Sequence, residues 1–375
     1  MKTVVIAPDS FKGSISASDA ARALAEGWTR VRPGDTIVLR PMADGGEGTL
    51  DAFAMAVRGA LRMPVTVDGP HHEPVDSEWL LLPPTPQSPR GIGVVELART
   101  SGIEVLGGLL NPWGADTRGF GEAIAAALDH GVSSLVVGIG SSASTDGGMG
   151  ALTALGARFT DRTGALVLRG LRGLATVEHA DLSLLRPVPP GGAIVLTDVS
   201  NPLLGPRGAA KIFGPQKGLD AEGMMRADQA LSRLAGLLAT DPSAQGAGAA
   251  GGAGYGMLTW GATLTPGARD VGRLIGLADA VANADIVVTG EGSFDGQSAE
   301  GKAPAHVAEL ARAAGIRAGL AAGRIARDAD LGEFSATEAL DMLSGSSEAA
   351  LAEPAKWLRE AGSRLGLALG NTTHP

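Results

Sequence analysis

The 375-residue chain contains no cysteine, which excludes disulfides, thiolate catalysis, cysteine-ligated zinc and iron–sulfur clusters. Aromatic side chains make up only 3% of the residues, so the core has to be built mainly from Ala, Val, Leu and Ile. No apolar run approaches the roughly 18 residues that a membrane helix needs. The apolar run before Pro8 is too short for a signal peptide. These absences together predict a cytoplasmic protein.

Positive charge is also in short supply. The chain has 31 Lys and Arg against 40 Asp and Glu, a net charge of −9, and no region concentrates the basic residues. An acidic surface repels nucleic-acid phosphates and anionic lipids, so neither nucleic acid nor a membrane is an expected partner. We expect small-molecule ligands and a monomer or homodimer.

Glycine, by contrast, is abundant, with 56 of 375 residues, about twice its usual share of ~7%. The chain opens with a predicted strand over 3–7, a helix over 16–30 with Ser16 as N-cap, and a strand over 36–40 that leads to a helix through Phe53. Further strands are predicted at 132–139, 193–196, 284–288 and 317–321, with a helix over 304–314. This alternation predicts an α/β fold in which helices cover a parallel sheet.

Polar, glycine-rich clusters follow these strands, and ligands of open α/β sheets bind beyond the carboxyl ends of the strands. After the first strand, Ser10 and Lys12 place a hydroxyl and an ammonium group where an ATP-using enzyme needs a cation for phosphate. After the second strand, Asp44 and Glu47 stand among glycines and could hold Mg²⁺ or a substrate hydroxyl. The alternative for both clusters is a capped helix with exposed charge.

The segment from Gly140 to Gly148 is the best local candidate for a phosphate-binding loop. Its hydroxyls and glycines precede an apolar helix, whose N–H donors and positive dipole end attract an anion. The candidate ligands are Gly140, Ser141, Ser142, Ser144, Thr145, Asp146, Gly147 and Gly148. The segment fits neither a P-loop nor a dinucleotide-binding glycine pattern, and the alternative is a tight turn that caps the helix.

Two further clusters contain candidate catalytic groups. Asp198 follows a predicted strand and Lys217 follows later in the chain, which suits a base or metal ligand together with a cation for a transferring phosphoryl group. The alternative is an Asx-turn followed by surface charge. The segment 296–302 matches the first seven positions of a P-loop, but Ala303 has no hydroxyl for Mg²⁺. Lys302 could still meet a phosphate or a carboxylate.

Three stretches concern domain organisation. Residues 68–90 are rich in Pro and polar residues, which predicts a hairpin with a long loop or the entrance to an inserted domain. Residues 241–254 are either an unstructured linker or a glycine-lined ligand loop before an apolar helix. A final helix over 348–369 has helical apolar spacing and is expected to pack on the first sheet.

The motifs taken together resemble one known family. VVIAPDSFKGSISA, PMADGGEGT, GIGSSASTDGGMG, DVSNPLLGPRGA, FGPQKG, GAAGGAGYG, VVTGEGSFDGQSAEGKAP and AAGR follow the order seen in bacterial glycerate kinases, over roughly residues 1–325. The resemblance is to members that phosphorylate the 2-hydroxyl of D-glycerate with ATP and Mg²⁺. It implies a Rossmann-like α/β domain made of 1–67 and 285–375, an inserted α/β domain over 68–284, and an active site in the cleft between them.

The resemblance also suggests roles for the candidate residues. The 140–148 loop would bind the nucleotide phosphates, and Lys12 and Lys217 would meet the developing phosphoryl charge. Asp198 would act as general base or Mg²⁺ ligand, with Asp44 as the second candidate for both roles. Substrate-binding candidates are Ser10, Glu47, Asp295, Lys302 and Arg324.

The chain departs from the family pattern at a few positions, and alternatives to its activity stay open. Ser141 and Thr145 stand where the family usually has Gly and Asn, and Ser293 stands where it often has Arg. Kinases that form 3-phosphoglycerate or act on a related hydroxy acid are one alternative. A NAD-dependent hydroxy-acid dehydrogenase is another, although the chain lacks the glycine pattern and following acid of such enzymes. The third alternative is a non-catalytic sensor of small acids.

Overall fold

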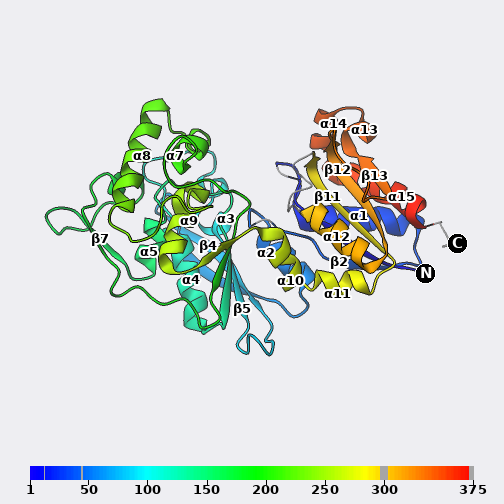
Figure 1. The fold of residues 1–375 in the computed structure, drawn as a ribbon, viewed down its shortest axis with the longest axis horizontal. Coiled ribbons are helices and arrows are strands. Elements are labelled where there is room, and N and C mark those ends of the chain that lie inside the picture. The colour runs from blue at the N-terminus through cyan, green and yellow to red at the C-terminus, as the bar shows by residue number, and fades with distance from the viewer. Residues whose placement is uncertain (12, 44, 296–302, 371–375) are drawn as a thin grey trace. The chain divides into compact units, whose positions relative to one another are not determined.

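The computed structural model describes residues 1–11, 13–43, 45–295 and 303–370. The predicted α/β class is confirmed, since parallel strands alternate with helices in two compact units (Figure 1). Unit 1 comprises 1–44, 51–58 and 268–375, and unit 2 comprises 45–50 and 59–267. The predicted domains, 1–67 with 285–375 and 68–284, stay a prediction.

Unit 1 is built on a parallel five-stranded sheet with the order β13-β12-β11-β1-β2. Its strands are β1 (Thr3–Pro8), β2 (Thr36–Leu39), β11 (Ile286–Phe294), β12 (Arg317–Ile325) and β13 (Ala336–Ala339). Strands β11 and β12 are longer than predicted, because they stay paired as far as Ser293 with Arg324 and Phe294 with Ile325. Part of the polar cluster expected after β11 thus belongs to the strand itself.

The helices of unit 1 join the two ends of the chain. They are α1 (Ala17–Val31), most of α2 (Thr49–Ala56) and of α10 (Gly267–Leu274), α11 (Leu277–Ala282), α12 (Ala303–Ala314), α13 (Leu340–Ser344), α14 (Ser347–Ala352) and α15 (Pro354–Gly370). Ser16 caps α1 as predicted, since its hydroxyl accepts the N–H of Asp19 at 3.1 Å. The single predicted C-terminal helix is two helices, because Pro354 starts a new one.

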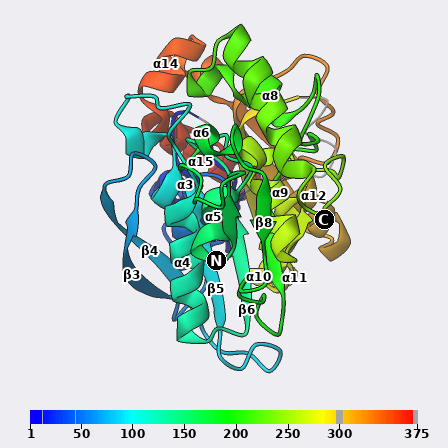
Figure 2. The same ribbon diagram turned by 90° about the vertical axis from the view of Figure 1, so that its left-hand side faces the viewer.

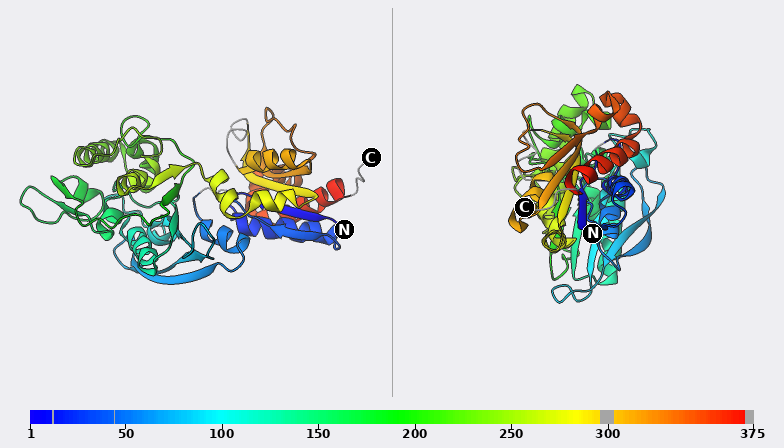
Figure 3. Two further views of the ribbon diagram at one scale, coloured as in Figure 1. Left: turned by 60° about the horizontal axis from the view of Figure 1, so that its bottom comes forward. Right: turned by 90° about the vertical axis from the view of Figure 1, so that its right-hand side faces the viewer.

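Helices α1 and α15 lie side by side at very short range, as Figure 3 shows for the blue and red segments. A Cβ atom on Gly27 would lie only 1.9 Å from the carbonyl oxygen of Arg359, so only glycine fits there. The hydroxyl of Ser363 donates to the carbonyl of Gly27 at 2.9 Å. The C-terminal helix also contacts β12 and β13 and completes the core of unit 1, which confirms its expected packing on the first sheet.

Unit 2 contains a six-stranded sheet with the order β10-β9-β6-β5-β4-β3. Its strands are β3 (Leu61–Asp68), β4 (Pro74–Leu82), β5 (Ile92–Glu96), β6 (Ser134–Gly138), β9 (Ala193–Leu196) and β10 (Thr263–Thr265). The pairs β3–β4 and β4–β5 are antiparallel and the other pairs are parallel. The hairpin expected near 68–90 is thus confirmed as β3–β4.

The remaining elements of unit 2 surround this sheet. They are α3 (Leu97–Ser101), η1 (Glu104–Leu106), α4 (Arg118–His130), α5 (Met149–Ala154), β7 (Arg158–Thr160), α6 (Leu171–Leu174), β8 (His179–Asp181), α7 (Ala209–Phe213), η2 (Pro215–Lys217), α8 (Ala221–Ala235) and α9 (Ala249–Trp260). Helices α4 and α5 pack together in the main core of the unit (Figure 2). No helix of the described chain is both long and apolar enough to span a membrane.

Helix α9 shows that residues 241–254 are not an unstructured linker. Ala250, Gly251 and Gly252 all have left-handed backbone angles, with φ of 56°, 68° and 90°. Gly251 and Gly252 are buried, and Tyr255, which follows on the same helix, is fully buried in the core of unit 2. The glycine-rich segment is therefore a packed part of the unit.

Candidate functional site

Four loop segments meet at the carboxyl ends of β6 and β9 in unit 2. The N–H of Gly140 donates to the carbonyl of Gly45 at 2.8 Å, which joins the 140–148 loop to the segment 45–50. A Cβ atom on Gly45 would lie 2.2 Å from the carbonyl oxygen of Leu196 at the end of β9. Backbone packs directly on backbone at this edge, which explains why glycine is needed here.

The two other segments complete the same edge. Gly248, just before α9, donates its N–H to the carbonyl of Asn201 at 2.9 Å. The N–H of Gly147 donates to the carbonyl of Gly251 at 3.1 Å. The segments 45–50, 140–148, 197–202 and 246–252 thus form one cluster, and two of them, 140–148 and 197–202, directly follow the parallel strands β6 and β9.

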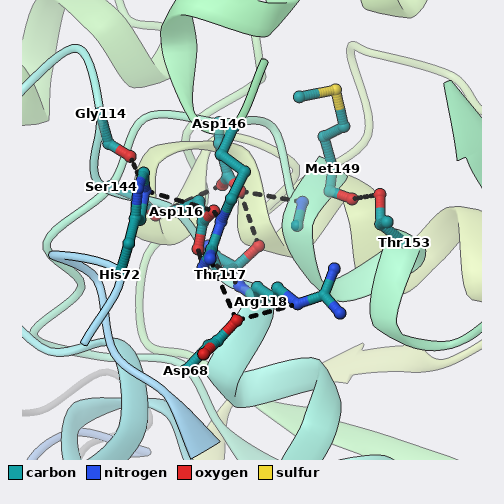
Figure 4. Close-up of polar contacts among 12 residues, drawn as sticks. Asp68, His72, Gly114, Asp116, Thr117, Arg118, Ser144, Asp146, Met149 and Thr153 are labelled. Carbon is teal, nitrogen blue, oxygen red and sulfur yellow. Dashed lines mark hydrogen bonds and ion pairs between the residues drawn. The ribbon is translucent and has the colours of Figure 1, made fainter. Parts of the chain in front are cut away.

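Asp146 holds the 140–148 loop together from within (Figure 4). Its buried carboxylate accepts hydrogen bonds from the N–H and the hydroxyl of Thr117, from the N–H groups of Gly148 and Gly150, and from the hydroxyl of Ser144. Burial raises the pKa of Asp146, and the nearby charge of Asp116 raises it further, while the N–H donors act in the opposite direction.

These contacts correct one expectation about the loop. The N–H groups of Gly147, Gly148 and Gly150 at the start of α5 already have acceptors inside the protein. The N–H of Ala151 is likewise taken by the hydroxyl of Thr117 at 2.9 Å. The start of α5 therefore offers none of these donors to an anion, and any donors for a ligand must come from earlier in the loop.

Such donors are present at the three preceding residues. Within the described chain, no acceptor lies in reach of the backbone N–H groups of Ser144, Thr145 and Asp146. The buried hydroxyl of Thr145 has no partner there either. Because buried polar groups in native proteins are almost always paired, this run of donors points to an acceptor that the described residues do not supply, such as water or a bound ligand. An anionic group such as a nucleotide phosphate fits these donors.

Lys217 lies on the inner side of this loop rather than on an exposed surface. Only 2% of its surface is accessible, and its Nζ donates to the hydroxyl of Ser142 at 2.7 Å and to the carbonyl of Ser144 at 2.5 Å. Burial lowers the pKa of Lys217 to about 7, and the charge of Asp146 opposes this shift. The alternative of surface charge at Lys217 is therefore wrong.

The segment 45–50 is fixed by a glutamate at the end of β5. The buried carboxylate of Glu96 accepts the N–H of Gly48 at 3.0 Å and that of Leu50 at 2.8 Å. It thereby satisfies free donors at the start of α2. Glu47, a predicted substrate ligand, lies between these anchored residues and is exposed.

Asp198 is exposed two residues beyond the end of β9, at the same edge as the other loops. Within the described residues, no three His, Asp or Glu side chains converge on a point where a metal could bind. Mg²⁺ usually takes only one or two carboxylates and completes its shell with water and substrate phosphates. The exposed carboxylate of Asp198 has the donor chemistry that a Mg²⁺ site with a single protein ligand requires.

The other predicted site residues belong to unit 1 or fall outside the description. Ser10 follows β1, Asp295 follows β11, and Arg324 is the last residue but one of β12. All three residues therefore lie near the carboxyl edge of the sheet of unit 1. The guanidinium of Arg324 donates to the hydroxyl of Ser293 at 3.4 Å. Lys12, Asp44 and Lys302 lie outside the described residues.

Sequence analysis missed a charged cluster behind Asp146, which Figure 4 shows in part. Asp116 is buried and accepts two hydrogen bonds from Arg169, at 2.5 and 3.0 Å. Arg169 also donates to Asp68 at 3.1 Å. Asp116 and Asp68 lie 53 and 101 positions from Arg169 in the chain, so no local pattern could have joined the three residues. Glu96 could have been found, because it ends a buried strand.

Comparisons with known proteins agree with this architecture. The sequence model of the glycerate kinase family matches residues 4–369. The glycerate kinase of Bacillus subtilis (strain 168) is 40% identical over 338 residues, which cover 87% of this chain and 86% of the relative. The glycerate 2-kinase of Escherichia coli (strain K12) is 38% identical over 317 residues, 82% of each chain.

A solved structure gives the same result for the fold. A crystal structure from Salmonella typhimurium LT2, assigned as glycerate kinase 2, matches with a TM-score of 0.80 and 34% identity over 98% of both chains. These relatives decide against the dehydrogenase and the non-catalytic sensor. With a family match over nearly its whole length, this chain belongs to the glycerate kinase family and is a kinase.

Proposed function

We propose that this protein transfers the γ-phosphoryl group of ATP to the 2-hydroxyl of D-glycerate and releases 2-phosphoglycerate and ADP. Membership of the family supports a kinase that acts on a small molecule, and one relative is named a glycerate 2-kinase. The observation that carries the proposal is the run of N–H donors at Ser144, Thr145 and Asp146 that no described residue accepts, which suits the phosphates of a nucleotide.

In this proposal the groups of unit 2 serve the nucleotide and the reacting hydroxyl. The 140–148 loop binds phosphate oxygens through the donors of residues 144–146, and the exposed hydroxyl of Ser141 adds to them. Asp198 takes the proton of the glycerate hydroxyl or binds Mg²⁺, and Glu47 binds the substrate. Mg²⁺, when bound, neutralises charge on the phosphates and favours an in-line transfer.

The groups of unit 1 serve the substrate in the same proposal. Arg324 pairs with the glycerate carboxylate, a geometry that a guanidinium suits, and Ser10 and Asp295 bind its hydroxyls. Lys12, Asp44 and Lys302 keep their predicted roles toward phosphate, Mg²⁺ and substrate. The predicted domains, 1–67 with 285–375 and 68–284, also stay part of the proposal.

The deciding experiment mixes the purified protein, D-glycerate and MgATP with enolase as the only coupling enzyme. Enolase converts 2-phosphoglycerate but not 3-phosphoglycerate to phosphoenolpyruvate, whose ultraviolet absorbance is followed while ADP is assayed in parallel. We expect both signals to rise together. ADP without phosphoenolpyruvate would contradict 2-phosphorylation and indicate the 3-hydroxyl or ATP hydrolysis. Absence of both signals would contradict glycerate as the substrate.

A further inference from the structure

Lys217 contacts the proposed phosphate-binding loop from its buried side. Its Nζ binds two oxygen atoms of the loop, the hydroxyl of Ser142 and the carbonyl of Ser144, at 2.7 and 2.5 Å. The same carbonyl is approached by Gly251, where a Cβ atom would lie 2.0 Å from the oxygen and 2.8 Å from Nζ. Lys217 and the left-handed segment of α9 therefore enclose the Ser144 carbonyl together.

We infer that Lys217 is a positioning residue: it fixes the Ser144–Thr145 peptide so that the N–H groups of the loop face the nucleotide, and it does not itself touch the transferred phosphoryl group. This inference rests on the proposed function of the loop. It replaces the expectation that Lys217 meets the developing phosphoryl charge directly.

Peptide geometry supports this role. The C=O of Ser144 and the N–H of Thr145 belong to one planar trans peptide, in which the two groups point in opposite directions. Because Lys217 holds the oxygen of this peptide, the N–H of Thr145 must point away from Lys217. An anion bound at that N–H would lie across the peptide from Nζ, so the ammonium group is badly placed to be its ligand.

The surroundings of Lys217 also suit a neutral amine. Both of its bonded acceptors are uncharged oxygens, and Asp146 is the acidic group that faces it, with Asp116 behind Asp146. An amine that has lost one proton keeps two N–H groups, enough for both acceptors. A positioning role thus survives deprotonation of Lys217, whereas stabilisation of phosphoryl charge requires the cation.

The first test is the pH dependence of kcat in the wild-type protein, with saturating MgATP and D-glycerate. Since the pKa of Lys217 is lowered to about 7, we expect kcat to hold or rise as the pH increases through this value. A kcat that falls with rising pH in the wild type, but not in Lys217→Met, would overturn the inference. It would show that the charge of Lys217 takes part in the transfer.

The second test measures hydrogen exchange in the loop and does not depend on activity. We expect Lys217→Met to speed hydrogen exchange of the bonded amides in the 140–148 loop at least about tenfold, because the Ser144 carbonyl loses its partner. Ser142→Ala, which leaves the Ser144 contact intact, should show a smaller effect in the same direction. Lys211→Met, at an exposed lysine of α7, is the matched control and should leave exchange and kcat unchanged. Unchanged loop exchange in Lys217→Met would overturn the inference.

Hydrogen exchange also separates this inference from the proposed function, because it does not depend on activity. Loss of the positioned donors should raise the KM for ATP at least about tenfold in Lys217→Met, with a smaller rise in Ser142→Ala. If the wild type forms no product from ATP and D-glycerate, the proposed function fails. The hydrogen-exchange comparison then still decides whether Lys217 holds the loop.

Discussion

One carboxylate oxygen of Asp146 accepts two hydrogen bonds from Thr117, from its backbone nitrogen at 2.9 Å and from its hydroxyl at 2.8 Å. The Thr117 hydroxyl in turn accepts the N–H of Ala151 in α5. This relationship ties the start of α4 to the start of α5, and it directs the carboxylate toward the protein interior. The 140–148 loop is therefore held from inside, and its donors without an acceptor among the described residues include the N–H groups of residues 144–146.

Replacing Asp146 with asparagine should destabilise unit 2. An amide has only one acceptor oxygen, so buried donors of Thr117 or Gly150 would face an NH₂ group and lose their partner. We expect the free energy of unfolding to fall by about 2–4 kcal/mol, measured by urea denaturation. The matched control is Asp129→Asn, which removes an exposed pair with Arg186, and it should cost less than about 1 kcal/mol. Equal effects of the two variants would contradict the role of Asp146.

Gly251→Ala should be far more harmful than an alanine at another left-handed glycine. Gly205 has φ of +87° and open space around a Cβ atom, whereas at Gly251 the added carbon would meet the carbonyl of Ser144. In both variants the left-handed alanine lowers the free energy of unfolding by about 1–2 kcal/mol. Only Gly251→Ala also displaces the loop. We expect Gly205→Ala to keep activity and Gly251→Ala to lose it, measured as kcat/KM for ATP. Similar losses in both variants would show that backbone strain alone is responsible.

Asp198→Asn should slow the reaction without affecting the fold, because Asp198 is exposed. A general base or a metal ligand contributes about 10²-fold or more to the rate, so we expect kcat to fall by at least that factor. Urea denaturation should give the same unfolding midpoint as for the wild type. The exposed Asp76→Asn serves as control. Turnover of Asp198→Asn within about tenfold of the wild type would rule out both roles.

His306 in α12 should make unit 1 less stable in mild acid. Burial lowers the pKa of His306 below 6.5, and the charge of Arg269 lowers it further, while Glu309 opposes the shift. The unfolded chain then binds the proton more readily than the folded one. The contribution of neutral His306 to stability is therefore complete above about pH 6.5 and is lost as the pH falls toward the pKa of the folded state.

A titration of the His306 ring protons by NMR measures this directly, and the midpoint should lie below 6.5. Urea denaturation at pH values above and below that midpoint should show a smaller pH effect in His306→Gln than in the wild type. The exposed His71→Gln is the control and should behave as the wild type does. A midpoint above 6.5 would contradict the assigned burial.

Local patterns were enough to predict much of the fold. The apolar run of β1, the cap at Ser16 and the spacing of α1 were all found at or near their true bounds, because each depends on neighbours within a few residues. The polar loops at strand ends followed from the same alternation. The division of the C-terminal helix was missed, although Pro354 marked it.

The site depended on contacts that no local pattern contains. Glu96 binds backbone groups 46 and 48 residues away, and Lys217 reaches Ser142 and Ser144 across 75 and 73 residues. The sequence by itself determined the α/β alternation, the motifs of the family and the strand-end loops, because these follow from short-range periodicity and residue type. Only the tertiary structure decided which N–H groups are already paired and which are free. Pairing is settled by packing between distant segments, and burial then makes each unpaired group costly.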